Sequence, residues 1–582
     1  MSQQEQEQQE QQEHAALCLP EILTCIANHL THMDFLNALL VSHAWHAHLM
    51  PLLWHTLILP QRWSVVMADS ESPSGFPEPL SFRKYGHLVR SLICNNLQHH
   101  ASYLVPACAQ LTELDIIDLS DDALPLLRLN VRTLMSIKLK RERDQLNKPF
   151  RTHDFVQILD ECLFLERIRL MDVTIEEHID LRGTIGGSGS GPVLDMRKPR
   201  PVIASAASGT KDDTLRTIAL FYQVLHRLSA LDLVGSVIRT PPPRIDVFYR
   251  LRKLALINSS MSYSNQLQFV SQCQYLTHLK LQLVRKSERL DVEELATLEL
   301  ATACPRIIHL DLMWSTIKDG EIAALLGQLP HLTSFWAQRT DLAEKSIEVL
   351  AGPMSRIRDQ LVELDLTDAR EMKSCWIQRL LSSCSGLRRF RATEIRVQDM
   401  MNQRQMATSA SADHPGPLSS WVCLKLQELQ LSIIGISAER SLEDQACVYD
   451  QLSRLTDLQI LSLGGNGMST WLRTQTLELS LQSGFDQLRT LKELRVFNFS
   501  YMAHDLGMDE VEFMMEHWKK LRKVVGTIGL RVQEKRYSRG WGTNSESRRS
   551  GGGGVEGGMV PKVERHEIYI HRKWPLVHFS SR

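Results

Sequence analysis

The sequence predicts an α/β solenoid in which short parallel strands line the inside of a horseshoe and helices line the outside, with a three-helix segment in front. Three observations lead to this prediction. An apolar pattern, L-x-x-L-x-L, recurs along most of the chain. Apolar residues at helical spacing follow several of its copies, and a separate apolar segment that begins with Leu-Pro precedes the first copy. One strand and one helix cannot bury their own apolar faces, so units of this kind stack against their neighbours.

Composition limits the possible partners. The 582 residues include 66 Lys and Arg and 67 Asp and Glu, which gives a net charge of -1. A near-neutral chain has no overall field that would attract nucleic acid or an anionic membrane, so we expect neither as a partner. Residues 1–16 form a Gln/Glu-rich tail without the basic and apolar regions of a secretory signal, and no apolar stretch is long enough to span a bilayer. We therefore expect an intracellular protein, cytoplasmic or nuclear, with reduced cysteines.

Residues 17–58 predict three short helices. Pro20 stands where the first helix begins, because the missing N–H of proline costs nothing in the first turn. Asp34 is positioned to cap the second helix. The apolar positions of the segment that we take as candidate contacts are Leu19, Pro20, Ile22, Leu23, Ile26, Leu36, Leu39, Val41 and Trp45. A unit of this size is hardly stable alone, so it would gain from docking on a partner or on the solenoid, to which residues 59–100 connect it.

The repeats extend over residues 101–530. In each copy the last two apolar positions alternate, so they point from a short strand into the core. Copies include Leu251-Leu254-Leu256, Ile307-Leu310-Leu312, Leu361-Leu364-Leu366, Leu387-Phe390-Ala392 and Leu491-Leu494-Val496; Leu332-Phe335-Ala337 is a weaker copy, and Leu521-Val524 is a degraded last one. Two Gly/Ser/Pro-rich insertions, near residues 183–213 and 397–420, lengthen the distance along the chain between two successive copies of the repeat. We expect these insertions to be mobile loops. Residues 531–582 form a Gly/Ser/Arg-rich linker and tail in which residues 567–571 predict a capping strand.

Helices are expected between the strands. The clearest begins near Asp319, which is placed to cap it, and its apolar residues Ile322, Leu325 and Leu326 fall on one side. Similar helices are predicted around residues 347–350 and 376–381.

Cysteines recur three residues before the first apolar position of a repeat, at Cys108, Cys162, Cys273, Cys304 and Cys384. Metal or redox chemistry is one interpretation of this placement. Because no C-x-x-C pair supplies a zinc site, a small buried residue in each repeat is the favoured one.

His43, His46 and His48 have spacings that can meet a metal, but no Cys or carboxylate completes the set. The sequence also has no phosphate-binding loop and no G-x-S-x-G elbow. We therefore expect neither cofactor nor metal nor catalytic residue, and hence a protein that is not an enzyme.

The register C-x-x-L-x-x-L-x-L, followed by an I-x-D-x-x-(L/I)-x-x-L helix, resembles the cysteine-containing repeats of the F-box/leucine-rich-repeat family over most of residues 101–525. The nine candidate contacts, together with Glu21, Leu30, Phe35 and Trp54, also follow the order of an F-box, although Ser42 and His43 stand where that family often has a Cys and a basic residue. The resemblance implies that this segment binds the Skp-type adaptor of a cullin-RING ubiquitin ligase. It also implies that the leucine-rich-repeat solenoid selects a protein substrate.

Two alternatives stay open. The helical segment can instead be a cap that closes the exposed end of the array, which repeat proteins need in any case. The chain would then be a leucine-rich-repeat interaction scaffold without a ubiquitin-ligase connection.

The side chains between the core positions should face the inner surface and contact the substrate. The candidates are His309, Asp311, Met313, Trp336, Asp365 and Arg391. Met313 and Trp336 are large apolar residues at positions without a core role, which is typical of interface hot spots, unless a neighbouring loop covers them. The mixed charges favour a protein ligand over a phosphate backbone.

Overall fold

The chain folds as two compact units, Met1–Gln282 with Arg289–Ile307 (unit 1) and Leu283–Glu288 with Ile308–Arg582 (unit 2). The structure, a computed structural model, describes residues 19–59, 83–95, 97, 101–141, 150–175, 211–244, 246–283, 302–400, 420–436, 441–464, 476–500, 502, 506–526, 566–569 and 578–581. Within these residues, no helix is both long and apolar enough to cross a membrane.

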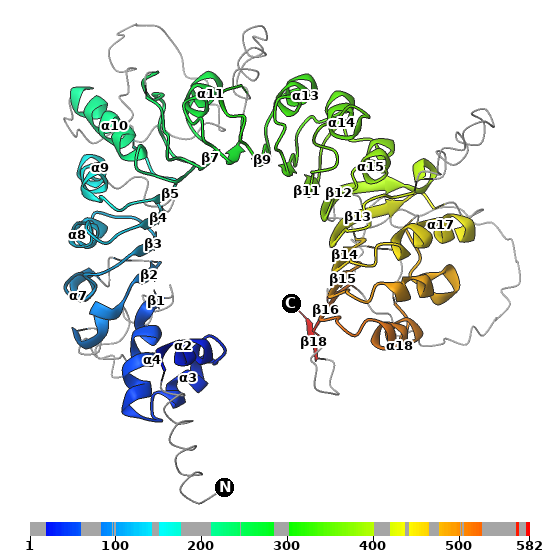
Figure 1. The fold of residues 1–582 in the computed structure, drawn as a ribbon, viewed down its shortest axis with the longest axis horizontal. Helices are drawn as coiled ribbons and strands as arrows, with labels where there is room; N and C mark the ends of the chain where they lie inside the picture. The colour runs from blue at the N-terminus through cyan, green and yellow to red at the C-terminus, as the bar shows by residue number, and fades with distance from the viewer. Residues whose placement is uncertain are drawn as a thin grey trace, which may run out of the picture. The chain divides into compact units, whose positions relative to one another are not determined.

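Unit 1 begins with three helices and continues as alternating strands and helices (Figure 1). Its helices are α2 (Pro20–Ala27), α3 (His32–Ala38), α4 (His43–His55), α7 (Ala101–Ala107), α8 (Ala123–Leu129), α9 (Thr152–Glu161), α10 (Lys211–Leu225) and α11 (Tyr263–Ser271), with a 3-10 turn η1 (Gly86–Leu88). Its strands are β1 (Thr56–Leu59), β2 (Ser91–Cys94), β3 (Glu113–Ile117), β4 (Ser136–Lys140), β5 (Arg167–Met171), β6 (Ala230–Val234), β7 (Lys253–Ile257) and β8 (His278–Leu281). All eight strands pair in parallel in chain order.

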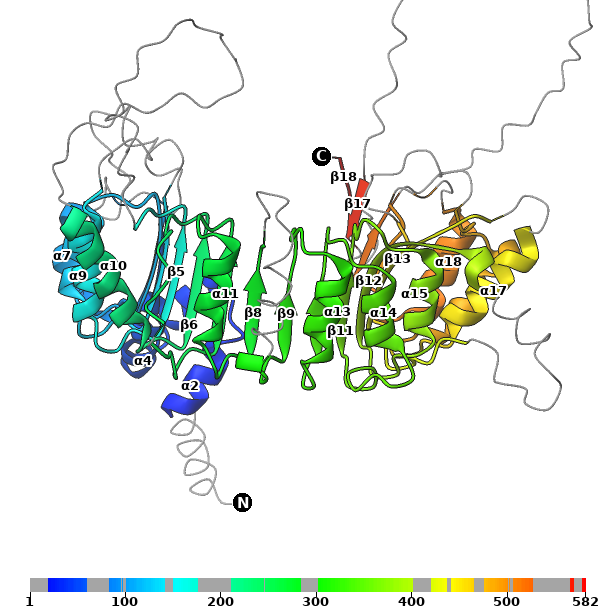
Figure 2. The same ribbon diagram turned by 90° about the horizontal axis from the view of Figure 1, so that it is seen from above.

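The strand register of unit 1 follows the repeat phase. The middle apolar residues of successive copies pair across the sheet, as in Ile168 with Leu231 and Leu231 with Leu254. These side chains are buried against the helices, which cover one face of the strands (Figure 2). We call the other side of each unit's sheet its helix-free face.

The described residues between β6 and β7 include no helix, because three consecutive prolines occupy that connection. Proline lacks the N–H that a helix interior needs, and its ring clashes with the preceding turn. The carbonyl oxygens of Pro242 and Pro243 instead accept hydrogen bonds from Nε2 of Gln272, at 3.5 and 2.7 Å.

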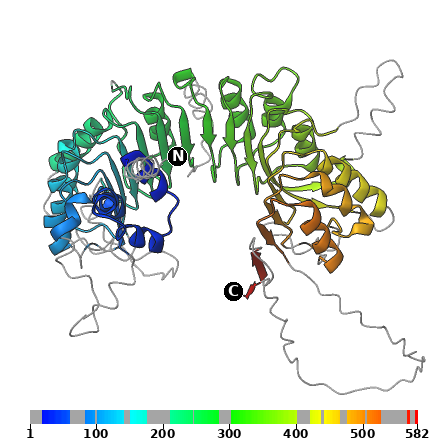
Figure 3. The ribbon, with the colours of Figure 1, turned by 60° about the horizontal axis from the view of Figure 1, so that its bottom comes forward.

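Unit 2 repeats the same alternation, with its helices again on one side of the strands (Figure 3). Its helices are α13 (Asp319–Gly327), α14 (Glu344–Ala351), α15 (Ser374–Leu381), α17 (Ser441–Ser453) and α18 (Met508–His517), with 3-10 turns η5 (Leu481–Ser483) and η6 (Phe485–Thr490). Its strands are β9 (His309–Asp311), β10 (Ser334–Trp336), β11 (Glu363–Leu366), β12 (Arg389–Arg396), β13 (Glu428–Ile434), β14 (Ile460–Ser462), β15 (Val496–Asn498), β16 (Lys523–Val525), β17 (His566–Tyr569) and β18 (His578–Ser581). Strands β9–β16 are parallel, whereas β17 and β18 add antiparallel pairs after β16.

The phase expected for one repeat is wrong. Leu494 was expected to be the middle position of the copy Leu491-Leu494-Val496, but Leu461 pairs with Phe497. The true copy is Leu494-Phe497-Phe499, three residues later, and all three of its side chains are buried. Val496 therefore lies on the helix-free side rather than in the core.

The predicted helices at residues 347–350 and 376–381 are confirmed by α14 and α15. The capping role expected of Asp319 is wrong for its own helix. The residue before α13 is Lys318, whose backbone N–H donates to Oε2 of Glu321 at 2.9 Å, and Asp319 already lies in the first turn.

The limits of the repeat array also differ from those expected. The parallel sheet begins at Thr56, inside the segments expected to be the helical front and the connector, because β1 and β2 pair in register with β3. The expected capping strand at residues 567–571 corresponds to β17, which ends at Tyr569. Most of the insertion near residues 183–213 and of that near 397–420 lies outside the described residues.

Candidate functional site

The three N-terminal helices enclose a small core of their own. Leu23, Ala38, Leu39 and Leu49 are buried at its centre. Ala27, Leu30, Phe35, Trp45, Met50 and Leu53 pack around them and are partly buried. The ring of Trp54, at the end of α4, stacks on Tyr85 at a centroid distance of 5.4 Å, which joins this bundle to the first repeats.

The nine candidate adaptor contacts fall into two groups. Leu23 and Leu39 are buried in the bundle core, where no partner can reach them, and Trp45 is partly buried there. Ile26 is half-buried. The exposed candidates are Leu19, Pro20, Ile22, Leu36 and Val41, and Val41 is 63% exposed.

Two further exposed apolar residues on these helices did not figure among the candidates. Met33 is 66% exposed in α3, and Leu40, 84% exposed, follows that helix directly. The helix ends at Ala38, so Leu40 is no longer held on its buried face.

The cap of α3 also differs from the expectation. Thr31, not Asp34, is the capping residue, because its hydroxyl accepts the backbone N–H of Asp34 at 3.3 Å. Asp34 in turn accepts a 2.6 Å hydrogen bond from the Thr31 hydroxyl. The two side chains therefore hold the turn between α2 and α3 together.

On unit 2 the helix-free face of β9–β13 carries two rows of side chains that the strand register fixes. The first row is His309, Ser334, Glu363, Arg389 and Glu428, and the second row is Asp311, Trp336, Asp365, Arg391 and Gln430. Five of the six candidate substrate contacts belong to these rows, so the structure brings them together as expected. Met313 follows β9 and is half-buried.

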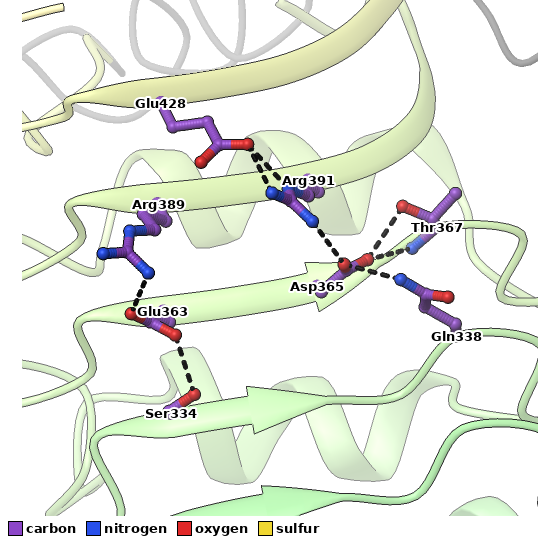
Figure 4. A network of polar contacts seen from close by, with 8 residues as sticks. All are labelled: Ser334, Gln338, Glu363, Asp365, Thr367, Arg389, Arg391 and Glu428. Atoms are coloured by element: carbon purple, nitrogen blue, oxygen red, sulfur yellow. Dashed lines mark hydrogen bonds and ion pairs between the residues drawn. The ribbon is translucent and has the colours of Figure 1, made fainter. Parts of the chain in front are cut away.

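Charged residues of the two rows form two groups of polar contacts, one around Glu363 and one around Arg391 (Figure 4). Arg389 contacts Glu363 at 2.6 Å, and Glu363 also accepts from the Ser334 hydroxyl at 3.1 Å. Arg391 reaches two carboxylates, Glu428 at 2.6 Å and Asp365 at 3.6 Å. Burial lowers the pKa of the Arg391 guanidinium, but the hydrogen bonds and charges of the two carboxylates outweigh it and raise the pKa overall.

Asp311 and Asp365 do not project into solvent as the sequence suggested, because both are buried. One Asp365 oxygen accepts from the backbone N–H and the hydroxyl of Thr367, at 3.1 and 2.8 Å. The other accepts from Gln338 Nε2 at 2.7 Å. Asp365 thus orients the side chains around it from a buried position. Arg391, which contacts Asp365, is more exposed and can be touched by a ligand.

Trp336 is half-buried, and the edge of its ring meets His309 at a centroid distance of 5.0 Å. The His309 ring nitrogen Nδ1 lies 2.7 Å from the Ser334 hydroxyl. These contacts fix the orientation of the indole and leave part of it accessible, as an interface residue requires.

Sequence reasoning missed an aromatic residue beside this face. Trp314 is 49% exposed, and the Arg339 guanidinium lies 4.0 Å from the centroid of its ring. Arg339 also contacts Asp368 at 3.3 Å. The three residues occupy the same position in three successive repeats, four residues after the middle apolar residue. All three have left-handed backbones, with φ of 63°, 55° and 57°.

Other repeats place residues that favour this left-handed backbone at the equivalent position, namely Asp118, Asp172, Gly235 and Asn258. A tryptophan or an arginine there is strained. Backbone strain of this kind is common at functional positions. The signal for it in the sequence was that Trp314 and Arg339 stand where other repeats have Asp, Asn or Gly.

The repeat cysteines are small buried core residues. Cys108, Cys162, Cys273, Cys304 and Cys384 are all fully buried. Burial raises the pKa of the Cys108 thiol to about 11 and that of the Cys162 thiol to about 12. His43, His46 and His48 are exposed on α4, and no metal-holding group of three or more ligands occurs in the described part of the chain.

No protein-family model matches the sequence, and neither does any curated protein. Among solved structures, the chain is similar to an internalin from Listeria monocytogenes, with 11% identity, a TM-score of 0.26, and coverage of 77% of this chain and 84% of that one. It is also similar to a leucine-rich-repeat protein of Leptospira interrogans, with 14% identity, a TM-score of 0.29, and coverage of 75% and 85%. The in-register parallel strands, the helices on one side and the one-per-repeat core positions of this chain itself define its architecture. The protein has the leucine-rich-repeat fold.

Proposed function

We propose that this protein is the substrate-recognition subunit of an SCF-type cullin-RING ubiquitin ligase. The three-helix bundle docks a Skp-type adaptor, and the helix-free faces of the repeats hold the protein to be ubiquitinated. The chain itself performs no bond chemistry in this role. It raises the effective concentration of the substrate near a recruited ubiquitin-conjugating enzyme.

One observation supports the adaptor half of the proposal above all others. Large apolar side chains are exposed on the small bundle at Leu19, Ile22, Met33, Leu36, Leu40 and Val41. A bundle with so few fully buried residues gains little stability from its own core. Exposed apolar residues gathered on such a unit are typical of a surface that a partner covers.

The polar side chains of unit 2 support the substrate half. The Arg391 network and the half-buried Trp336 combine oriented charges with an aromatic anchor. Binding energy in protein interfaces concentrates in such aromatic and arginine residues.

The test is capture of the purified Skp-type adaptor by the full-length chain. Leu40→Asp/Val41→Asp should abolish capture, because a charge would have to be buried against the adaptor. Leu163→Asp is the matched control: Leu163 is similarly exposed, at 69%, but lies on the repeats. We expect this control to bind like the unaltered chain, and circular dichroism should show both variants folded.

Failure of the unaltered chain to capture the adaptor would overturn the proposal and leave a leucine-rich-repeat interaction scaffold. The proposal is equally overturned if the Leu40→Asp/Val41→Asp variant binds as tightly as the unaltered chain. Deleting residues 1–55, which spares β1, separates the two roles further, because a scaffold would keep its partner binding and its cellular role.

A further inference from the structure

The helix-free face of unit 1 is cationic at strands β5–β8. Arg167 and Lys253 occupy the first outward row, and Arg169 and Lys280 occupy the second, where Asp232 is the one carboxylate among the described outward positions of these strands. The Arg169 guanidinium lies 3.9 Å from Asp232. Among the described outward positions of these strands, four cations against one carboxylate give a net positive charge, in contrast to the carboxylate-rich rows of unit 2.

A cluster of arginines and tyrosines continues this face at the ends where β7 and β8 begin. The guanidinium groups of Arg252 and Arg306 each lie 4.9 Å from the centroid of the Tyr275 ring. Arg252 also donates to the Tyr275 carbonyl at 3.0 Å. The exposed Tyr249 ring lies 6.1 Å from that of Tyr275.

These arginines are held in place without being neutralised. Within the described residues, neither Arg252 nor Arg306 makes an ion pair, and the same is true of Lys253 beside them. Stacking on an aromatic ring orders a guanidinium and keeps its edge available for a bidentate contact with a carboxylate.

The opposite ends of the same strands are apolar. Met171, Val234 and Ile257 pair in register as the third outward row and are half-buried. Ile257 lies five positions after Arg252, which is about 17 Å along an extended strand. The surface is therefore cationic at one end and apolar at the other. The two ends are as far apart as the ends of an extended peptide of about five to six residues.

We propose that this surface binds an extended acidic segment of a protein partner. The carboxylates of the segment lie at the Arg252–Arg306 end, and an apolar side chain about five residues away lies on the row Met171, Val234 and Ile257. This inference rests on the proposed function, since it names the class of substrate that the repeats select.

Charge complementarity favours an acidic peptide over a nucleic acid. Asp232 lies in the middle of the surface and would repel a continuous phosphate backbone, whereas a peptide can place an uncharged residue opposite it. The apolar row likewise offers nothing to a sugar-phosphate chain, but it fits an aliphatic side chain.

The experiment uses the full-length chain and an array of immobilised peptides. Each peptide has a block of three glutamates and a Leu-Val block, separated by zero to eight Gly/Ser residues, in both orders. We expect binding to peak where the blocks lie about five residues apart, and to fall on scrambling. Arg252→Ala/Arg306→Ala should weaken binding of the best peptide by about tenfold or more, because both bidentate contacts are lost.

The matched control is Arg388→Ala/Lys425→Ala, which removes exposed cations from the corresponding positions ahead of the strands of unit 2. This control should bind like the unaltered chain. Binding that is independent of block spacing, or equal in the two double variants, would overturn the proposal. A single-stranded oligouridylate that displaces the best peptide and binds more tightly would overturn it in favour of RNA.

The outcome is separable from that of the adaptor test, because the array contains no adaptor. Arg252→Ala/Arg306→Ala should capture the adaptor normally. Peptide binding without adaptor capture would retain the acidic-segment site and overturn only the ligase role.

Discussion

The carboxylate of Asp319 accepts a hydrogen bond from the backbone N–H of Ser346, 3.1 Å from Oδ1, although the two residues belong to different repeats. The same carboxylate accepts the N–H groups of Ala343 and Lys345, each at 2.8 Å. Ala343 is the capping position of α14, where its side chain can accept no hydrogen bond, and Lys345 and Ser346 belong to the first turn of that helix. Asp319 in α13 therefore caps the helix of the next repeat, and the interaction contributes to the interface between the repeats.

Replacing Asp319 by Ala should lower the free energy of unfolding by about 1–2 kcal/mol, the usual cost of a lost helix cap. Urea unfolding followed by circular dichroism measures this loss. Asp341→Ala is the control, because its 3.7 Å contact with Arg370 is an exposed ion pair worth at most about 1 kcal/mol. Equal losses in the two variants would show that Asp319 acts only as a surface charge.

This cap shows how far the sequence predicts the fold. The residue type and its place near a helix start identified Asp319 as a cap, but local spacing assigns a cap to its own helix. The neighbouring helix comes within reach only once the strands are in register. The misplaced Leu494 copy has the same origin, since Leu491-Leu494-Val496 and Leu494-Phe497-Phe499 both fit the pattern and only pairing with Leu461 decides between them.

The candidate site was predictable to a similar degree. Alternation placed Trp336, Asp365 and Arg391 in one row, as the register confirms. Alternation could not show that Asp365 is buried. Its carboxylate is enclosed by Gln338 from the preceding repeat and by Thr367 two residues later, and these contacts exist only in the folded array.

Trp314→Asn should leave the free energy of unfolding unchanged or raise it by up to about 1 kcal/mol. A left-handed backbone costs a bulky residue about 1–2 kcal/mol, which asparagine avoids, whereas the lost contact with Arg339 was worth about 0.5–1 kcal/mol. Thermal and urea unfolding measure this change in the free energy of unfolding. The same change at Trp336, which lies in a strand, relieves no backbone strain and should destabilise the protein. Loss of stability of similar size in both variants would argue against strain at Trp314.

The repeat cysteines should resist alkylation in the folded protein. Burial raises the pKa of the Cys162, Cys304 and Cys384 thiols to about 12, so little reactive thiolate exists at pH 8. Of the cysteines that the structure describes, Cys25 and Cys375 are exposed and should be modified first by iodoacetamide. Mass spectrometry of digested protein after brief labelling measures the order. Early labelling of Cys304 in protein that is still folded would contradict the burial of the repeat cysteines.

Replacing Asp365 by Ala should lower the free energy of unfolding by about 1–3 kcal/mol, because Thr367, Gln338 and Arg391 lose a shared buried acceptor. Asp365→Asn keeps an oxygen for Thr367 and should cost less. Arg389→Ala removes a more exposed pair with Glu363 and should cost at most about 1 kcal/mol, less in high salt. The loss at Asp365 should change little between low and high salt, because solvent ions do not screen buried contacts. A loss that disappears in high salt would mean that Asp365 contributes through exposed charge rather than through the buried hydrogen bonds that orient this face.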